Sequence, residues 1–417
     1  MTGRAFVIGA GLAGLSAATT LAGRGVSVTL IEAAGQAGGR CRSYFDAAMG
    51  GVIDNGNHFV LSGNRAVMDY VRAIDAEHAL AKLDDVGVSF VDFRDGARWR
   101  IAPNDGVFPF WLFDKKRRVP GTELKDYLAL GKLLAAKPGQ RIEDVMACKG
   151  VLWDRLLHPF FLGALNSEPK TASATLAGAI VRGSFARGGR AYRVRIAHPT
   201  LAAAFVDPAL ACLDSKGASV RLGTRLRGLT LNGCSAMALD TGEASIPVAA
   251  GDAVVLAVPP WAAADLVPGL TVPDDFRAIV NAHFKIPGPP GAPPMLGVIG
   301  GTAEWIFPFA DRISVTISGA DAIVDQDRED LAIRIWADVT RALNISGPMP
   351  AWQIVKEKRA TFAATPEQDA RRPAAKTRWR NLFLAGDWTQ TGLPATIEGA
   401  LRSGETAAAL ALRHLSL

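Results

Sequence analysis

The chain has 417 residues, of which 49% are hydrophobic and 21% are charged, so it can bury a large core and form two interleaved domains. A net charge of +6 is modest for this length and no nucleic-acid-binding motif is present, which argues against a nucleic-acid partner. The four cysteines show no paired or metal-ligand spacing, so we expect no metal and a reducing, cytoplasmic location.

The N-terminal segment predicts a strand, a tight turn and a helix that together bind a nucleotide. Residues 5–8 are an apolar run of strand length, the motif Gly9-x-Gly11-x-x-Gly14 follows at once, and residues 15–22 have helical composition. Gly9 permits the turn, Gly11 lets a pyrophosphate approach the backbone, and Gly14 lets the helix pack closely on the strand. The phosphates would meet the positive N-terminus of the helix.

A second strand, residues 26–31, leads to Glu32, whose carboxylate can accept hydrogen bonds from the ribose hydroxyls of an adenosine. NAD and FAD both use such a unit. The following Gly38-Gly39-Arg40 adds a glycine turn and a cation that can contact the dinucleotide phosphates, which favours FAD. A solvated surface arginine is the alternative interpretation of Arg40.

The segment from Asp54 to His58 is flanked by apolar residues of high strand propensity. If it is extended, Asp54, Gly56 and His58 project from one face, and Gly56 leaves a bare patch that a flat ring can approach. The alternative is a core histidine paired with Asp54 by a hydrogen bond.

Residues 86–93 and 97–101 flank Asp95-Gly96 and predict a hairpin that opens a substrate-binding region. The chain returns to the cofactor domain after Tyr192 and leaves it again near Thr271. We therefore predict a cofactor domain made of residues 1–85, 193–270 and 374–417, and a substrate domain made of residues 86–192 and 271–373.

An aromatic stretch followed by a basic cluster predicts a peripheral contact with an anionic membrane, so the inner face of the cell membrane is an expected location. Each charge near such a surface contributes about 1 kcal/mol. An apolar strand lining a pocket, followed by a solvated charge run, is the alternative. The residues concerned are Phe108, Phe110, Trp111, Phe113, Lys115, Lys116, Arg117 and Arg118.

Composition and periodicity predict the remaining elements. We expect helices at residues 200–216 and 327–343, and a buried strand at 253–258 that is ended by two prolines. Further strands are expected within 219–248 and at 279–286, 295–299, 305–309, 313–318 and 353–361.

The C-terminal segment predicts a second half of the same cofactor site. Residues 382–385 form a buried-strand run, Gly386-Asp387 ends it, and residues 397–412 have the pattern of an alanine-rich amphipathic helix. Asp387 can bind the hydroxyls of a polyol chain, and the free backbone N–H groups at Ala395 to Ile397 can face charge on a flavin ring. A purely structural turn is the alternative.

Together these motifs resemble the amine oxidase and phytoene desaturase superfamily of FAD enzymes, over the whole chain. Within it the chain is most similar to the hydroxysqualene dehydroxylase family, the squalene-associated desaturases of bacterial hopanoid biosynthesis. The narrower resemblance depends on Asp54–His58, on His158–Asn166 with Thr171–Ala174, and on Lys356–Thr361 leading to Arg372-Pro373. Asn57 and Ser167 stand where glutamine and threonine are expected.

The resemblance implies an α/β fold in which a discontinuous Rossmann-like FAD-binding domain is interleaved with an α+β substrate domain. It implies non-covalent FAD, because the C-terminal motif contains no cysteine. It also places backbone at Leu226 against the adenine. The implied FAD-binding residues are Gly9, Gly11, Leu12, Ala13, Gly14, Glu32, Ala33, Gly39, Arg40, Gly56, Asn57, Leu226, Gly386, Asp387, Pro394, Ala395 and Thr396.

The implied activity is reductive dehydroxylation of hydroxysqualene, an isoprenoid lipid, to squalene. His58 would protonate the leaving hydroxyl with Asp54 as its orienting partner, and Asn166 would contact that hydroxyl or cap local structure. The external electron donor stays open. Alternatives are an oxidative carotenoid-type desaturase, an amine oxidase with a cage built from Trp352, Trp388 or Lys285, and a non-enzymatic flavin-bearing scaffold.

Overall fold

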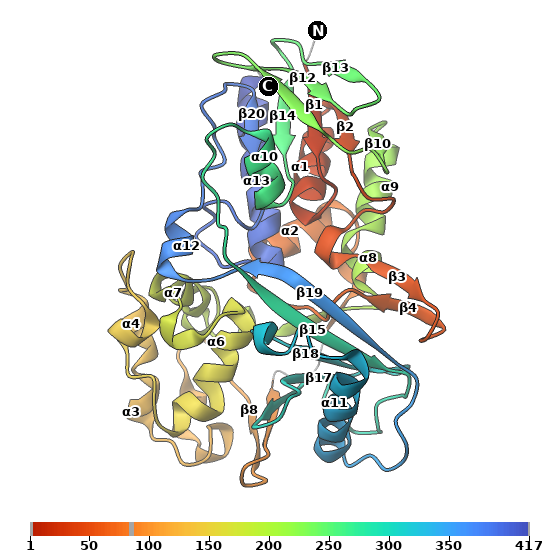
Figure 1. The fold of residues 1–417 in the computed structure, drawn as a ribbon. Helices are drawn as coiled ribbons and strands as arrows, with labels where there is room; N and C mark the ends of the chain where they lie inside the picture. The colour runs from red at the N-terminus through yellow and green to blue at the C-terminus, as the bar shows by residue number, and fades with distance from the viewer. Residues whose placement is uncertain (1–2, 83–86, 416–417) are drawn as a thin grey trace.

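The computed structural model describes residues 3–82 and 87–415. Figure 1 shows two halves, one above the other: a sheet with helices at the end that carries both termini, and a second sheet with helices below it. The long strands β15 (Phe276–Phe284) and β19 (Trp352–Phe362) cross the middle of the molecule.

The first sheet is built from segments that lie far apart in the sequence. All its neighbouring strands are parallel. In three of the strands, residues 5–8, 253–256 and 382–384 are all apolar and buried, as expected where both faces of a parallel sheet are covered. Their order is β10 (Ser219–Arg221), β2 (Ser27–Ile31), β1 (Arg4–Ile8), β14 (Ala253–Leu256) and β20 (Leu382–Leu384).

Helices cover one face of this sheet and a small antiparallel sheet covers the other. The helical face shares one apolar core with α1 (Leu12–Gly23), α2 (Arg65–Ala73), α8 (Leu201–Phe205), α9 (Asp207–Ser215) and α13 (Ile397–His414). The opposite face packs against α10 (Pro260–Leu266) and the sheet of β11 (Gly228–Leu231), β12 (Ala236–Asp240) and β13 (Ser245–Pro247).

The second sheet has one apolar and one partly polar face. Helix α11 (Arg328–Leu343) packs on the apolar face, where Val280 and Val315 are fully buried. The other face of β15 and β18 presents polar side chains such as Asn281 and Thr316. The strand order is β19, β15, β18 (Ile313–Ile317), β17 (Trp305–Pro308), β16 (Leu296–Ile299), β7 (Val88–Asp92) and β8 (Arg98–Ile101), with only β16 and β7 parallel among these neighbours.

A layer of short helices packs against β7, β8 and β17 through Phe90, Trp99 and Trp305. It contains α3 (Leu124–Tyr127), α4 (Leu130–Leu133), α5 (Ile142–Val145), α6 (His158–Leu165) and α7 (Ala174–Gly183). The remaining elements are the hairpin of β3 (Ser43–Asp46) and β4 (Gly51–Asp54), the sheet of β5 (Phe59–Leu61), β9 (Val194–Ala197) and β6 (Leu80–Lys82), and helix α12 (Pro366–Ala370).

The predicted fold class is confirmed, whereas the domain boundaries stay a prediction. The hairpin of β7 and β8 forms as expected, although Val86 lies outside the described residues. The single helix predicted at residues 200–216 is wrong: α8 and α9 are separated at Val206. The cause is Pro208, which lacks an N–H group and clashes with a preceding carbonyl in a continuous helix.

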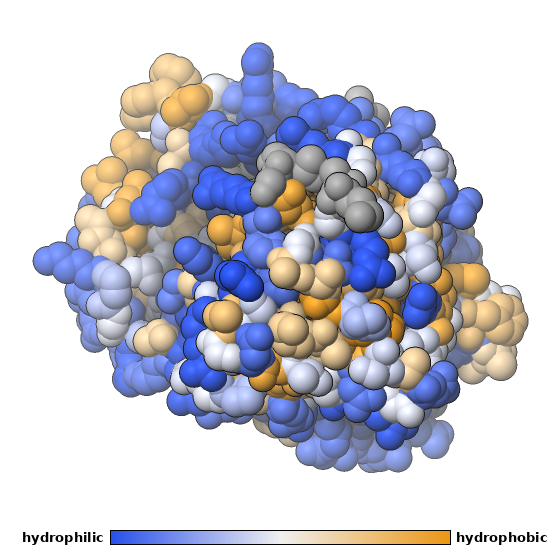
Figure 2. All heavy atoms as spheres, turned by 90° about the horizontal axis from the view of Figure 1, so that it is seen from above, coloured by the Kyte–Doolittle hydropathy of each residue, from blue (hydrophilic) through white to orange (hydrophobic). Residues whose placement is uncertain are grey.

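Within residues 3–82 and 87–415, no helix has the length and apolar character needed to cross a bilayer. Figure 2 looks down on the end that carries both termini. That face is largely hydrophilic, and its hydrophobic residues form separate patches, some of them toward the left and right edges.

The contact between α1 and α13 generates a stability prediction. A Cβ atom added at Gly404 would lie 2.3 Å from the Ala13 carbonyl oxygen, which belongs to helix backbone and cannot move aside. We expect Gly404→Ala to lower the free energy of unfolding by about 1–3 kcal/mol, the range for overpacking. Gly23→Ala, at the open end of α1, is the matched control because its Cβ meets nothing within 4 Å. Equal urea midpoints for the two variants would contradict the close packing.

Candidate functional site

The N-terminal glycine turn has the geometry of a phosphate-binding turn. Gly9 has φ +103°, and a Cβ at Gly14 would lie 1.8 Å from the Gly9 carbonyl oxygen, so both glycines are required by the protein itself. A Cβ at Gly11 would meet nothing within 4 Å. Gly11 is also the N-cap of α1 and supplies no side-chain cap, so the first N–H groups of the helix stay available for an anion.

Glu32 lies directly after β2, at the carboxyl end of the parallel sheet. Its Oε2 accepts a hydrogen bond from Ala10 N at 2.7 Å, and its Oε1 accepts one from Ala34 N at 2.8 Å. The neighbouring Ala33 is exposed. The chain before buried Leu226 runs alongside, since Thr224 N donates to the Glu32 carbonyl at 2.8 Å. The predicted adenosine-binding residues therefore lie together.

Arg40 joins the two ends of the chain. Its Nη2 donates to Asp387 Oδ1 at 2.7 Å, and its Nη1 donates to the Ala360 carbonyl on β19 at 2.6 Å. Burial alone would lower the pKa of Arg40, but the Asp387 carboxylate outweighs it and the pKa is raised. A backbone bridge between Gly11 and Gly38 places this turn beside the first glycine turn. Arg40 is thus a paired cation, although its side chain is 44% exposed.

The C-terminal loop is held by a buried arginine that the sequence reasoning missed. Arg372 is 2% exposed, and its Nη2 donates to the Asp387 carbonyl at 3.1 Å and to Thr391 Oγ1 at 2.7 Å. An arginine beside a proline carries no local signal of burial, so the sequence does not predict this role. Thr396 caps α13, with its Oγ1 accepting from Gly399 N at 3.1 Å.

The other residues of this loop that are predicted to bind FAD lie before Thr396, the N-cap of α13. Gly386 has φ +148°, and a Cβ there would lie 2.2 Å from Trp388 Nε1, so the strand end needs glycine. Pro394 and Ala395 directly precede Thr396 at the start of α13. This half of the site therefore presents the N-terminus of a second helix.

The predicted pairing of Asp54 with His58 is wrong. Asp54 Oδ1 accepts hydrogen bonds from Ser43 Oγ at 2.5 Å and from Leu201 N at 2.9 Å, and Arg312 Nη2 lies 3.6 Å from Oδ2. Among the described residues no hydrogen bond joins Asp54 to His58. The reason is that the extended segment expected from Asp54 to His58 does not form, because β4 ends at Asp54 and β5 begins at Phe59.

The loop between β4 and β5 is anchored on the polar face of the second sheet. Asn57 Nδ2 donates to Thr316 Oγ1 at 3.2 Å, and Asn281 Nδ2 donates to the Asn55 carbonyl at 3.3 Å. A Cβ at Gly56 would lie 3.1 Å from Asn281 Nδ2. Asn281 therefore packs closely against Gly56, and this packing accounts for the glycine.

His58 lies half-buried beside this loop, with its Nε2 3.5 Å from the position of a Cβ at Gly56. Burial, with a smaller contribution from the positive charge of Arg40, lowers the pKa of His58 to about 4. Near neutral pH the imidazole is uncharged, so His58 is a poor source of a full proton there.

Asn166 has no free group for a substrate. Its side chain is buried, and Nδ2 donates to Thr361 Oγ1 at 2.9 Å while Oδ1 accepts from Gly319 N at 2.7 Å. The substrate contact predicted for Asn166 is therefore contradicted, and the structural alternative describes it. Asn166 holds the end of α6 to the second sheet.

A buried acid that sequence reasoning missed lies next to Asn166. Ser318 N, adjacent to Gly319, donates to Glu304 Oε2 at 2.6 Å, and Oε1 has no hydrogen-bond partner among the described residues. Burial raises the pKa of Glu304 to about 7, against smaller lowering contributions from Ser318 and Trp305. A single glutamate before an aromatic strand gives no sequence signal of this kind.

The residues suggested for an amine-binding site lie in two separate places, with Trp388 apart from Trp352 and Lys285. Trp388 is buried and its Nε1 donates to the Val258 carbonyl at 3.0 Å, in the first half of the molecule. Trp352 pairs with Phe284 and packs on the α11 side of the second sheet. Lys285 follows Phe284 there, with its Nζ near Gly50. This separation disfavours the amine oxidase alternative.

Comparison with known proteins decides the family. The model of the flavin containing amine oxidoreductases matches residues 12–412. A hydroxysqualene dehydroxylase of Rhodopseudomonas palustris is 53% identical over 97% of both chains, and that of Zymomonas mobilis is 46% identical over 98% of this chain and 99% of its own. The chain belongs to the flavin-containing amine oxidoreductases, and within them to the hydroxysqualene dehydroxylase family. It is an FAD-dependent oxidoreductase, as the sequence predicts.

Solved structures show the same fold at low identity. Cyclohexylamine oxidase from Brevibacterium oxydans has a TM-score of 0.73 at 16% identity and covers all of both chains. A putrescine oxidase variant has a TM-score of 0.72 at 17% identity, covering 98% of this chain and 99% of its own. These structures support the fold alone.

The raised pKa of Glu304 predicts how the stability of the protein depends on pH. Between about pH 4.5 and pH 7 the folded protein holds a proton that the unfolded chain has released, so the free energy of unfolding falls as pH rises through this window. We expect Glu304→Gln to match the wild type at the acid end and to be more stable by up to about 3 kcal/mol at pH 8. Urea titrations measure this, with exposed Glu143→Gln as control. An equal effect at both pH values would contradict a raised pKa.

Proposed function

We propose that the protein catalyses the reductive dehydroxylation of hydroxysqualene to squalene in bacterial squalene and hopanoid synthesis. The observation that carries this proposal is identity of 46–53% over nearly the whole chain with three relatives named hydroxysqualene dehydroxylase. A protein of Synechococcus elongatus named "Probable zeta-carotene desaturase" is 24% identical, so the oxidative alternative has weaker support.

The two ends of the chain fit one FAD molecule. The open position at Gly11 and the uncapped start of α1 would receive the pyrophosphate, with Arg40 beside them. Glu32 would bind the ribose hydroxyls, and Asp387 the ribityl hydroxyls. The other residues proposed to contact FAD are Gly9, Leu12, Ala13, Gly14, Ala33, Gly39, Gly56, Asn57, Leu226, Gly386, Pro394, Ala395 and Thr396.

Bound and reduced, FAD supplies the hydride that replaces the allylic hydroxyl. The hydroxyl leaves as water, and the proton that it gains comes from solvent. On the order of one His58 side chain in a thousand is protonated at pH 7, because its pKa is about 4. We therefore assign His58 the role of a neutral hydrogen-bond donor to the departing oxygen, since neutral imidazole keeps one N–H. Asp54 holds the β3–β4 hairpin to α8 and has no part in orienting His58.

The protein is also proposed to contact a membrane surface, because its substrate is an apolar isoprenoid. We call Phe108, Phe110 and Phe113 the aromatic cluster; their exposed fractions are 56%, 66% and 62%. Exposed Lys115 and Lys116 follow in the chain. Apolar side chains beside cations fit an interface of acyl chains and anionic headgroups.

Three of the eight residues expected at the membrane are not exposed. Trp111 is 4% exposed and packs edge-on against Tyr127, with ring centroids 5.7 Å apart. Arg117 is partly buried and its Nε donates to the Ala102 carbonyl at 2.7 Å, and Arg118 is buried. The reason is that Phe110–Phe113 forms a 3-10 turn, which directs Trp111 inward and leaves Phe110 and Phe113 outside.

Single-turnover chemistry tests the proposed function. The purified enzyme is reduced anaerobically and mixed with hydroxysqualene in detergent, and flavin absorbance and extracted lipid are followed together. We expect one squalene per flavin reoxidised. Reduction of the oxidised enzyme by a carotenoid precursor, without turnover of hydroxysqualene by the reduced enzyme, would assign the protein to the desaturases.

The same assay tests the role of His58. We expect His58→Ala to slow the single turnover by about 10²-fold, because the variant loses one hydrogen bond to the charge that develops on the departing oxygen. The wild-type rate should change little between about pH 6 and pH 8, because His58 stays neutral in that window. A rate that falls as pH rises through about 7 would instead match the buried acid Glu304.

Vesicle sedimentation tests the membrane contact. We expect Phe110→Ser to weaken binding to vesicles of phosphatidylcholine and phosphatidylglycerol by about tenfold or more, since a buried phenyl group contributes about 1.5–3 kcal/mol. Phe45→Ser, on the β3–β4 hairpin, is the matched control because Phe45 is 68% exposed. Equal losses for both variants would contradict the assignment of the aromatic cluster.

A further inference from the structure

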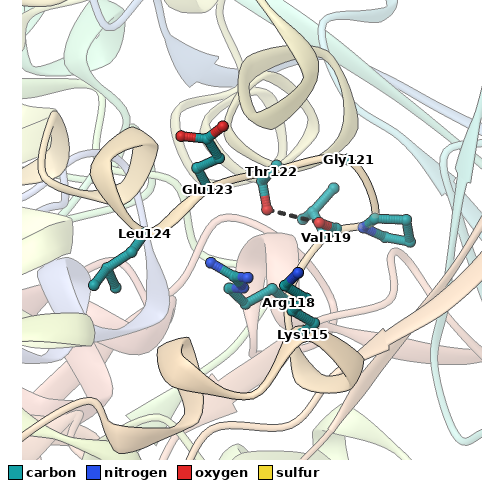
Figure 3. Close-up of a pocket in the computed structure, with 8 residues that line it drawn as sticks. Lys115, Arg118, Val119, Gly121, Thr122, Glu123 and Leu124 are labelled. Atoms are coloured by element: carbon teal, nitrogen blue, oxygen red, sulfur yellow. Dashed lines mark hydrogen bonds between the residues drawn. The ribbon is translucent and has the colours of Figure 1, made fainter.

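A surface hollow of about 450 Å³ lies directly after the aromatic cluster in the chain. Figure 3 shows its lining, with Arg118 and Lys115 on one side and the turn from Val119 to Leu124 around the other. The hydroxyl proton of Thr122 is not free to bind a ligand, because Thr122 Oγ1 donates to the Val119 carbonyl at 2.6 Å.

Arg118 is the unusual member of this lining. The residue is 8% exposed, its Nε is buried without a hydrogen-bond partner, and its guanidinium makes no ion pair among the described residues. Two other buried arginines are paired, Arg312 with Asp311 at 3.1 Å and Arg372 with Asp369 at 2.9 Å. A buried cation without a partner is costly, so Arg118 lacks the anion that its position calls for.

The rest of the lining does not supply that anion. Glu123 is the one carboxylate among the lining residues, and it pairs with Lys125 at 2.8 Å. In Figure 3 its carboxylate points away from the Arg118 guanidinium. Lys115 adds a second positive charge to the same hollow. The hollow therefore favours an anion small enough to reach a recessed guanidinium.

The neighbouring aromatic cluster limits what this anion is. Phe113 stands two residues before Lys115, and the Phe108 and Phe113 rings lie 6.3 Å apart and nearly parallel. An apolar surface beside a cationic hollow fits a molecule with an anionic head and an apolar tail. Guanidinium binds phosphate oxygens through two parallel hydrogen bonds, which favours a phosphate head.

We propose that the hollow at Arg118 and Lys115 binds the headgroup phosphate of an anionic phospholipid while the aromatic cluster enters the acyl region. This inference rests on the proposed membrane contact and deepens it, because it replaces a diffuse attraction between charges by one defined lipid site. The site would orient the enzyme on the bilayer and has no part in the chemistry of dehydroxylation.

The test uses holoenzyme and dihexanoyl phosphatidylglycerol below its micelle concentration, with binding measured by calorimetry. We expect one saturable site per chain, weakened about tenfold or more in Arg118→Gln and less in Arg118→Lys, which keeps the charge but loses the paired donors. Lys116→Gln is the matched control because Lys116 has the same charge and lies outside the hollow. We expect it to bind the short-chain lipid like the wild type.

The other outcomes would overturn the proposal. Equal losses of lipid affinity in Arg118→Gln and Lys116→Gln would indicate attraction by the overall positive charge instead of a defined site. Inorganic phosphate that binds as tightly as the lipid would indicate a free-phosphate site. Arg118→Gln should unfold at the wild-type temperature or above, because it removes an unpaired buried charge; a lower temperature would indicate a structural arginine. Turnover of detergent-solubilised hydroxysqualene should be unchanged, so failure of the lipid site is distinguishable from failure of the proposed function.

Discussion

The guanidinium group of Arg40 bonds to Asp387 in the C-terminal loop and to the Ala360 carbonyl on β19. These contacts join segments separated by more than three hundred residues and link both ends of the chain to the second sheet. The Arg40 side chain is half-exposed. Its two hydrogen bonds hold it in one orientation, while one edge of the guanidinium group stays open to solvent. The glycine turn at Gly11 lies directly beside it, so this crossing brings the two proposed halves of the cofactor site together.

The second constraint is the division of the second sheet into two unlike faces. Alternate residues of β15 and β18 pack against α11 or turn their polar groups toward the loop between β4 and β5. This loop then carries His58 in a position where burial and Arg40 keep it neutral. The polar face of the second sheet therefore fixes where the loop between β4 and β5 lies, and with it the position of His58.

The glycine turns, the strand ends at Glu32 and Asp387, and the return of the chain to one sheet follow from local patterns, because turn and strand signals are local. The pairing of Asp54 could not be predicted, since its partners Ser43 and Leu201 belong to other elements. The partners of Asn166, Thr361 and Gly319, could not be predicted for the same reason. Glu304, Arg372 and Arg118 were missed or misplaced because burial of a charged residue is decided by distant neighbours. Pro208 was a local signal that should have divided the helix at 200–216.

The most direct test of the whole account is a crystal structure of the protein with FAD and squalene. The account predicts a pyrophosphate at Gly11 and the start of α1, the Arg40–Asp387 pair intact beside it, and the flavin ring between the C-terminal loop and His58, with the hydrocarbon within reach of both. A flavin ring far from His58, or a pyrophosphate away from the Gly11 turn, would contradict the proposal that the two ends of the chain form one catalytic site.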